Sequence, residues 1–345
     1  MKSQRAIIIW LFSGCLLIWA MVVLGGITHL TNSGLSMVNW SFMGSFPPLT
    51  HAQWQSAFNA YKATPQFKLV NSYFSLADFK SIYWPEYIHR TVGRLTGIVF
   101  IIPFLYFLIR KMVSRQLLGK LLVILAMGGL QGLLGWYMVK SGLVNRPDVS
   151  HYRLAAHLIT AFLTFGFTFW VALDLIYPER AKNEQLKTLK RLSYALFFFL
   201  LLQIMYGAFV SGLHAGRFDP TWPKMGNNWI APEVTSLSPW WQNFVDGVAG
   251  VQFVHRYNAY LVVLLVFLLW YKSRKLQLHT TQRKGINFLL GMVFLQFILG
   301  VLTLINSDPI TLGVLHQTGA FLLFASTVFV IHQWEVAPAE KKVAA

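Results

Sequence analysis

The chain has 345 residues, of which 55% are hydrophobic and 12% are charged, and its mean hydropathy is +0.51. A soluble domain has about 25% charged residues, so the composition argues against a soluble globular protein and for a membrane protein. The net charge of +17 requires no nucleic-acid partner, because the basic residues follow a membrane pattern described below, and the single cysteine, Cys15, excludes an intrachain disulfide and a cysteine-based metal site.

Apolar residues form eight long blocks, each of about 18–23 residues, close to the ~20 that a helix needs to cross the hydrocarbon. In chain order the blocks are Ala6–Ile27, Val92–Ile109, Leu117–Val139, Leu154–Ile176, Leu192–Leu213, Val248–Trp270, Ile286–Ile305 and Ile310–Val330. We therefore predict an all-α, polytopic membrane protein with eight transmembrane helices.

The first block indicates where the protein resides. It is too long for the core of a cleaved signal peptide, no A-x-A-like site follows it, and the segment before it is too short for a transit peptide. We expect an uncleaved helix in a bacterial cell inner membrane. Of the 29 Lys and Arg residues, 18 lie in the segments on the side that holds both termini. Because such residues are enriched on the cytoplasmic side, both termini are predicted to be cytoplasmic.

The long external segment after the first block carries its own helical signals. Residues 50–53 (Thr-His-Ala-Gln) read as a capping box, and Trp54, Phe58 and Tyr61 share one face of the helix that follows. This pattern predicts a short amphipathic helix at the membrane surface, and residues 75–78 are a candidate start for a second. A lid over a site that opens to this side is the functional alternative.

The second half of the chain repeats features of the first half. Residues 86–90 match residues 252–256, residues 131–135 match residues 296–300, and His157 matches His316. An even number of helices per repeat inserts both halves the same way up, so we predict two pseudo-symmetric four-helix bundles. The first half spans residues 1–178, a cytoplasmic linker spans 179–191, and the second half spans 192–345.

Four histidines lie at equivalent places in the predicted second, fourth, sixth and eighth helices. They are His89, His157, His255 and His316. All four lie in the outer half of the membrane, where an ionisable side chain is a functional candidate. Two imidazoles per bundle suit a six-coordinate haem, whereas zinc requires three or four compact ligands. A packing role for a single histidine is the alternative, and four equivalent positions weigh against it.

Four arginines accompany these histidines. Arg90 and Arg256 directly follow His89 and His255, while Arg94 and Arg153 lie four residues from Arg90 and His157. Haem carries two propionates, and the guanidinium fork suits carboxylates, so the four arginines are candidate haem-binding residues. Snorkelling of each side chain to the membrane interface is the alternative.

The two halves differ at one position that bears on chemistry. Glu86 lies three residues before His89, and Gln252 lies three residues before His255, so each shares a helix face with its histidine. One predicted pocket therefore has an acid or base, and the other has an amide. Proton-coupled chemistry is predicted in the first half, and a fixed haem that passes electrons is predicted in the second.

At these residues the chain resembles the haem A synthase family, over about Ala6 to Trp334. The motifs are residues 25–31 with 33–36, 86–90 with 93–95, 153–158, 223–226 with 229–230, 252–256, and 316–317. Residues 47–61 and the lack of loop cysteine pairs resemble the mitochondrial and proteobacterial branch. The family usually has an arginine where this chain has His29.

The resemblance implies an oxidoreductase, a haem A synthase. Haem O would be oxidised at a ring methyl, through a hydroxymethyl stage, to the formyl group of haem A for cytochrome oxidase. By matching position, His89 and His157 would hold the substrate haem O, His255 and His316 a permanent haem b, and Glu86 would be catalytic. Haem O synthase and cytochrome oxidase assembly factors are candidate partners. The electron-transfer partner and homo-oligomerisation are left open.

Two other function classes remain alternatives. The first is a dihaem b membrane protein that only transfers electrons, and the second is a haem carrier or exporter. Glu86 opposite Gln252 favours the enzyme, because an electron relay gains nothing from one acid and a carrier would need only equal halves.

The distribution of basic residues gives a testable topology. A reporter that is active only in the periplasm, fused after Ala345, should be silent, because the carboxyl terminus is predicted to be cytoplasmic. The same reporter inserted in the loop between the fifth and sixth helices should be active. A strong signal from the terminal fusion would contradict the topology and the outer placement of the four histidines.

Overall fold

The computed structural model describes residues 2–38, 44, 46–145, 147–179 and 183–337. Within these ranges the chain forms helices and loops and no named β-strand, and eight helices are long and apolar enough to span a membrane. They are α1 (Lys2–Leu30), α4 (Leu76–Ile109), α5 (Arg115–Asn145), α6 (His151–Ile176), α7 (Lys187–Gly212), α8 (Val248–Ser273), α9 (Thr280–Ile305) and α10 (Ile310–Gln333). The prediction of an all-α protein with eight membrane-spanning helices is confirmed.

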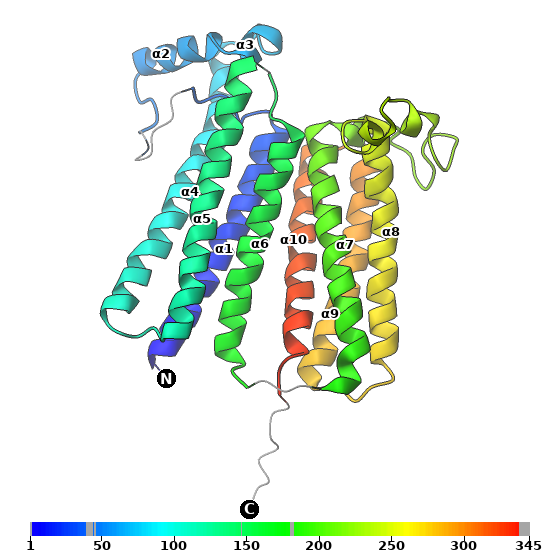
Figure 1. Ribbon diagram of the computed structural model, residues 1–345. Helices are drawn as coiled ribbons and strands as arrows, with labels where there is room; N and C mark the ends of the chain where they lie inside the picture. Colours follow the sequence, from blue (N-terminus) through cyan, green and yellow to red (C-terminus); the bar gives the residue numbers. More distant parts are fainter. Residues whose placement is uncertain (1, 39–43, 45, 146, 180–182, 338–345) are drawn as a thin grey trace, which may run out of the picture.

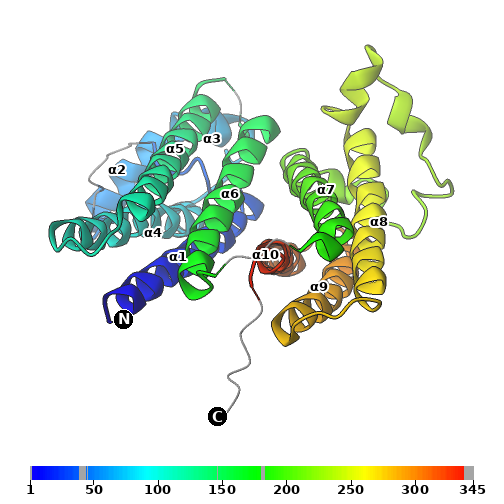
Figure 2. The same ribbon diagram turned by 60° about the horizontal axis from the view of Figure 1, so that its bottom comes forward.

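The long helices stand side by side, with α1, α4, α5 and α6 at one end of the molecule and α7, α8, α9 and α10 at the other (Figure 1, Figure 2). Three contacts join these groups, α6 with α7, α1 with α10, and α6 with α10. The division into two related bundles stays a prediction. Parts of the predicted linker and of the carboxyl-terminal segment, residues 180–182 and 338–345, lie outside the described residues.

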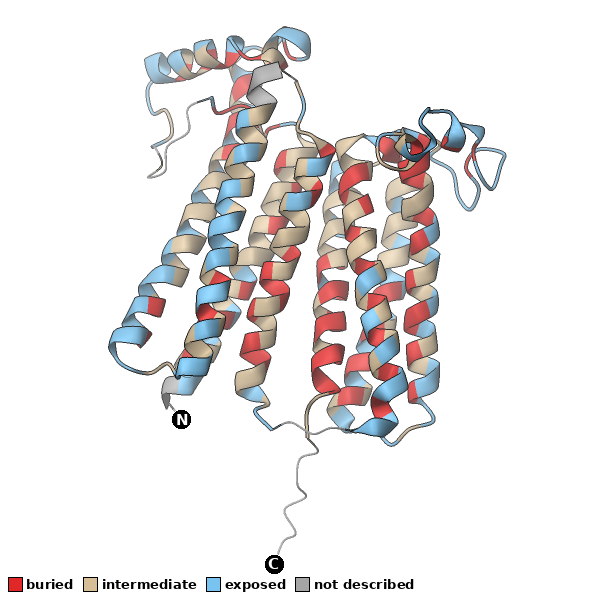
Figure 3. Ribbon diagram, in the orientation of Figure 1, coloured by how far each residue is buried: buried red, intermediate tan, exposed pale blue. Residues whose placement is uncertain are grey.

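The middle of the molecule is its best-packed part. Half of the most apolar window of α10 and 44% of that of α6 are buried, compared with 11% for α4 and for α5 (Figure 3). The largest apolar cluster joins Phe162 and Phe165 of α6 to Phe321 and Phe324 of α10. In the absence of a hydrophobic driving force between helices in lipid, this dense van der Waals packing holds the two groups together. Residues of the outer helices α4 and α5 line a cavity that is described below.

Helix α4 begins at Leu76, well before the predicted apolar block Val92–Ile109 and before Glu86 and His89, which were predicted to lie in this helix. The sequence from Glu86 to Arg90 interrupts the apolar run, but the helix continues through it. Ser75 and Asp78 form the capping box of α4 itself, so the prediction that they start a separate short helix is wrong. The extension is stabilised outside the apolar block by its own packing, because Phe79 is fully buried.

Two short helices cover the outer ends of α4 and α5. Helix α2 (His51–Lys62) has the predicted capping box and buries Trp54, Phe58 and Tyr61, and helix α3 (Pro65–Leu69) follows it. Helix α2 contacts α4, and α3 contacts α5. The predicted amphipathic helix is confirmed. Its role as a lid stays a prediction, which gains a structural basis from Gln66 of α3, a residue that lines the cavity described next.

Candidate functional site

One continuous cavity of about 1260 Å³ runs between the two groups of helices. Its lining is mostly apolar and includes eight of the nine residues predicted for the site. These are Glu86, His89, Arg90, Arg94, His157, His255, Arg256 and His316. The cavity exceeds the 300–1,000 Å³ typical of a pocket for one small ligand, so it has room for more than one. Residues far apart in the sequence thus converge on a single space.

His255 of α8 and His316 of α10 face each other across one end of this cavity. Their ring centres are 6.4 Å apart and their planes are inclined at 82°. A metal–imidazole bond is about 2 Å long, and the ring centre lies about 1 Å beyond the bonded nitrogen, so two rings on opposite sides of one ion have centres about 6 Å apart. The pair therefore fits an ion held between two imidazoles, as in six-coordinate haem. Among the described residues, no cluster of three or more His, Cys, Asp or Glu is arranged to hold a metal ion.

His89 of α4 and His157 of α6 line the other end of the cavity. Within the described part of the chain, Nδ1 of His157 is buried and has no hydrogen-bond partner. Buried polar atoms without partners are rare in folded proteins, so this nitrogen is a mark of a site rather than of packing.

Each of the four rings packs on a glycine of the preceding long helix. A methyl group added at Gly25 would lie 3.2 Å from Nε2 of His89, and one added at Gly300 would lie 2.9 Å from Cε1 of His316. The equivalent distance to Cε1 is 3.3 Å both from Gly135 to His157 and from Gly207 to His255. Small residues let helices approach closely, and here they let an imidazole come close to a neighbouring backbone.

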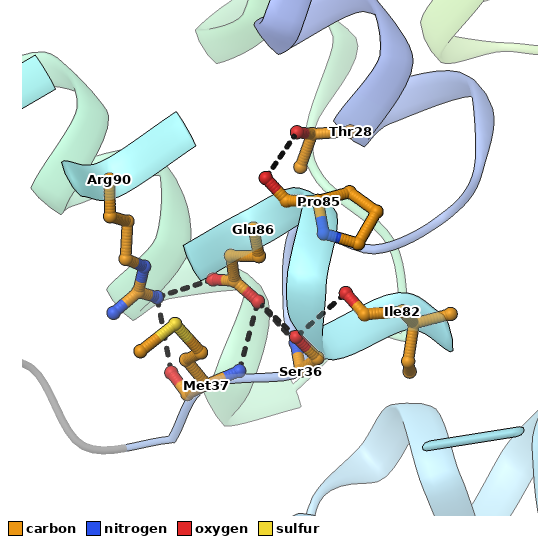
Figure 4. Close-up of polar contacts among 7 residues, drawn as sticks. All are labelled: Thr28, Ser36, Met37, Ile82, Pro85, Glu86 and Arg90. Atoms are coloured by element: carbon orange, nitrogen blue, oxygen red, sulfur yellow. Dashed lines mark hydrogen bonds and ion pairs between the residues drawn. The ribbon is translucent and has the colours of Figure 1, made fainter. Parts of the chain in front are cut away.

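Glu86 is buried, with 2% of its surface exposed, in a network with the loop after α1 (Figure 4). Its Oε2 accepts hydrogen bonds from Ser36 N at 2.7 Å, Ser36 Oγ at 2.5 Å and Met37 N at 2.9 Å. Its Oε1 pairs with Nη2 of Arg90 at 2.5 Å, and the same nitrogen donates to the Met37 carbonyl at 3.1 Å. The pair one turn apart on α4 therefore fastens this loop over the cavity.

Gln252 and Arg256 fasten the loop after α7 in the same way. Nε2 of Gln252 donates to the carbonyls of Ala215 and Phe218. The Arg256 guanidinium donates to main-chain carbonyls of residues 219, 221 and 224, at 2.6–3.1 Å. The loop after α1 presents N–H groups, which a carboxylate accepts, while the loop after α7 presents carbonyls, which an amide can donate to. The Glu-to-Gln difference thus has a structural cause, which the sequence analysis did not foresee.

The arginines differ in how much donor capacity they retain. Within the described residues, Nη1 of Arg90 is buried and has no hydrogen-bond partner. In the Arg256 guanidinium, Nε is the one nitrogen that is buried without such a partner among these residues. Arg153 is not among the described residues that line the cavity, and its guanidinium lies 4.8 Å from the centre of the Tyr137 ring. Arg94 lines the cavity. The structure therefore offers Arg90 as the arginine best placed to meet an anion in the cavity.

The outer end of the cavity is polar. His29 at the end of α1, His214 after α7 and Asp308 before α10 line it. Burial raises the pKa of the Asp308 carboxyl above its ordinary value, and the positive charges of Arg217 and His214 oppose that shift. The sequence analysis left a supporting role open for His29 and His214 and did not identify Asp308, which no local motif marks.

Comparison with known proteins places these features in a family. The model of the COX15-CtaA family, described as cytochrome oxidase assembly protein, matches residues 8–328. The chain belongs to this family. It is 49% identical to the haem A synthase of Flavobacterium psychrophilum over 97% of this chain and 99% of that protein. It is 46% identical to the haem A synthase of Nitrosospira multiformis, over 96% and 94% of the two chains. It is 40% identical to the haem A synthase COX15 of Arabidopsis thaliana, over 96% of this chain and 75% of that protein.

The contacts between the glycines and the four predicted haem-ligating histidines of this chain can be tested. Gly300→Ala should displace the His316 ring, because the new methyl group would lie 2.9 Å from it, and should lower the haem absorbance of the purified protein at least severalfold. Gly291→Ala on the same helix is the matched control, since nothing lies within 4 Å of that methyl position. Equal haem absorbance in both variants would contradict the contact.

Proposed function

We propose that the protein is a haem A synthase, which oxidises a ring methyl of haem O through a hydroxymethyl stage to the formyl group of haem A. The observation that carries this proposal is the nearly full-length similarity to proteins named haem A synthase. The cavity supports it, because two pairs of histidines from different helices meet in one apolar space. The formylated product would serve cytochrome oxidase, in keeping with the family description.

The two histidine pairs would hold different haems. His255 and His316 would hold a permanent haem b, which supplies single-electron transfer when bound. Support comes from the distance of 6.4 Å between their ring centres. His89 and His157 would hold the substrate haem O, and Glu86, three residues before His89 on α4, lines the same cavity. Both sites share one cavity, so electrons removed from the substrate have a short path to the second site.

Arg90 would bind a propionate of the substrate. Its Nη2 is occupied by Glu86 and the Met37 carbonyl, while its buried Nη1 retains its donor. A carboxylate at Nη1 would satisfy this donor with a charge-assisted hydrogen bond. Arg94 is a second candidate from the same helix, whereas Arg256 would act mainly by holding its loop. A haem contact by Arg153 stays a prediction.

Glu86 would receive protons as the methyl group is oxidised. Its Oε2 already accepts three hydrogen bonds, but Oε1 accepts only the one from Arg90. Each carboxylate oxygen has two acceptor positions, so Oε1 is the atom with spare capacity. The network fixes the carboxylate in the cavity wall, from where it would act as a general base.

The helices and the charge pattern also support a location for the protein. The eight apolar helices place the chain in a lipid bilayer, and the positive-inside pattern supports a bacterial inner membrane with both termini cytoplasmic. Haem O synthase is a candidate source of substrate. A protein that only transfers electrons between two haems would not need an acid at Glu86. The loop contacts give the Glu-to-Gln difference a structural cause as well, so this difference alone does not separate the two functions. The haem content of the purified protein decides between the enzyme and the electron-transfer protein.

The assignment of sites predicts different haem losses from two histidine variants. Purified wild-type protein should yield haem b together with haem O or haem A on chromatography of the extracted haem. His255→Ala should remove the low-spin haem b, because one axial ligand is lost, and His89→Ala should retain it and abolish haem A formation. Haem b alone from the wild type, in a host rich in haem O, would contradict the enzyme. The opposite behaviour of the two variants would reverse the sites.

Glu86→Gln tests the proton acceptor. The amide oxygen can still accept the hydrogen bonds of the loop, but the amide nitrogen faces Arg90 and no base remains. We expect the variant to insert and to bind haem, and haem A formation to fall by about 10²–10⁴-fold. Haem O should accumulate if the first oxidation is blocked, and the hydroxymethyl haem if a later one is blocked.

Ser36→Ala is the matched control for Glu86→Gln. It removes one donor to Oε2 at 2.5 Å and leaves the carboxylate in place. We expect a change in haem A formation of less than about tenfold, the size of one net hydrogen bond. If Glu86→Gln makes haem A at nearly the normal rate, or if Ser36→Ala is equally inactive, then Glu86 serves to hold the loop and not to move protons.

A further inference from the structure

The two ends of the cavity differ in how closely the outer helices pack. Helices α4 and α5 stand side by side at one end of the molecule, and α8 and α9 at the other (Figure 2). Of the most apolar window, 11% is buried in α4 and in α5, compared with 28% in α8 and in α9. Residues of all four helices line the cavity. The cavity is therefore less enclosed between α4 and α5 than between α8 and α9, and the residues at matching positions show why.

Glycines line the cavity between α4 and α5. They are Gly97 of α4 and Gly128, Gly129 and Gly132 of α5. A methyl group added at any of these glycines would meet no atom of the described residues within 4 Å. Glycines in membrane helices usually allow a close approach of a neighbouring helix, but here no neighbour occupies the space. The missing side chains therefore leave room that belongs to the cavity.

The matching positions of the second half carry large apolar side chains. In the match between α5 and α9 described above, Gly132 corresponds to Phe297, and Phe297 also lines the cavity. The other pairs are Gly97 with Val263, Gly128 with Val293 and Gly129 with Phe294. The space that glycines leave open in the first half is thus occupied by side chains in the second half.

Two further aromatic side chains hold Phe297 in place. Its ring centre lies 5.5 Å from that of Tyr260 on α8 and 6.3 Å from that of Trp222 in the loop after α7. Nε1 of Trp222 donates to the Tyr260 hydroxyl at 3.0 Å, and all three side chains line the cavity. In the first half, Arg94 stands at the position of Tyr260. Three linked rings therefore line the second half of the cavity, and the matching positions of α4 and α5 carry an arginine and a glycine.

The two haems of the proposed function differ in one large substituent. Haem O carries a long isoprenoid chain where haem b carries a vinyl group, and this chain stands on the side of the ring that faces away from the propionates. With a propionate at Arg90, beside the loop after α1, the chain would extend away from that loop. Gly132 and Gly128 lie one turn apart on the same face of α5, farther from that loop than Gly135, which contacts His157. The open space therefore lies where the chain would extend.

We propose that Phe297 is a specificity-determining residue that excludes a haem with an isoprenoid chain from the second site, and that Gly132 at the matching position leaves room for this chain in the first site. The inference rests on the proposed function, because two haems that differ in this chain would have to be sorted within one cavity. The Phe297 ring, fixed by Tyr260 and Trp222, would resist displacement, since adding volume to a packed site forces its side chains out of their preferred positions.

The test for Phe297 measures the second site alone. In His89→Ala the first pair of histidines lacks one ligand, so the haem that remains reports on His255 and His316. Phe297→Ala is combined with His89→Ala in the full-length protein, and both proteins are purified from a host that accumulates haem O. The haems are then extracted, and haem b is resolved from haem O by chromatography.

We expect His89→Ala to carry haem b with little haem O, and the added Phe297→Ala to raise the ratio of haem O to haem b by about tenfold or more, as expected when an overpacked site is relieved. Phe294→Ala is the matched control, because it removes the same ring from the same helix. Phe294 is exposed and is not among the described residues that line the cavity. This control should leave the ratio within about twofold, as for an ordinary surface substitution.

Gly132→Phe, in the otherwise unchanged protein, makes the reverse change. It should lower the content of haem O and haem A by about tenfold and leave haem b in place, because the new ring occupies the space for the chain. Gly119→Phe is its control on the same helix. No described residue lies within 4 Å of a methyl group at Gly119, which does not appear among the described residues of the cavity lining.

Two results would overturn the proposal. The first is a loss of haem from the protein with Phe297→Ala without any gain of haem O, because Phe297 would then only pack the second site. The second is a normal content of haem O and haem A in Gly132→Phe. Neither result would affect the haem A synthase assignment, which is overturned instead if the wild type holds haem b alone in a host rich in haem O. If Phe297→Ala fails to insert, Phe297→Leu tests the same exclusion with a smaller loss of volume.

Discussion

An imidazole between packed helices requires space at the helix surface, and a glycine on the neighbouring helix supplies it. The missing side chain lets the ring approach the backbone, so that an added methyl group would stand only 2.9–3.3 Å from a ring atom. Four such contacts, between α1 and α4, α5 and α6, α7 and α8, and α9 and α10, set where the histidines stand, and the cavity forms between them.

A second constraint closes the outer side of the cavity. The loops after α1 and α7 have backbone groups without regular partners, and such groups cannot remain unsatisfied near the membrane. Glu86 with Arg90 on α4 and Gln252 with Arg256 on α8 satisfy several of these groups. The acid appears where the loop offers N–H groups, and the amide where it offers carbonyls. The difference between Glu86 and Gln252 therefore matches the difference between the two loops that they bind. The Glu86 carboxylate also lines the cavity, where it is available to a bound substrate.

The sequence predicted the parts that depend on long patterns. Eight apolar blocks gave the spanning helices, and the repeat gave four histidines that the structure brings to one cavity. The first ten residues of α4 were not assigned to it, because Glu86 and Arg90 break the apolar run and the capping box at Ser75 was interpreted as the start of a separate helix. The position of Arg153 over Tyr137 depends on how α5 and α6 pack. The contacts between the histidines and the glycines depend in the same way on which helix faces which.

The four glycine contacts are common to both halves, whereas the outer loops differ between them. Glu86 accepts hydrogen bonds from N–H groups of the loop after α1, and Gln252 donates to carbonyls of the loop after α7. A repeated scaffold can therefore keep the same four histidine positions while one wall of the cavity gains a carboxylate, because the loops and not the long helices carry the difference.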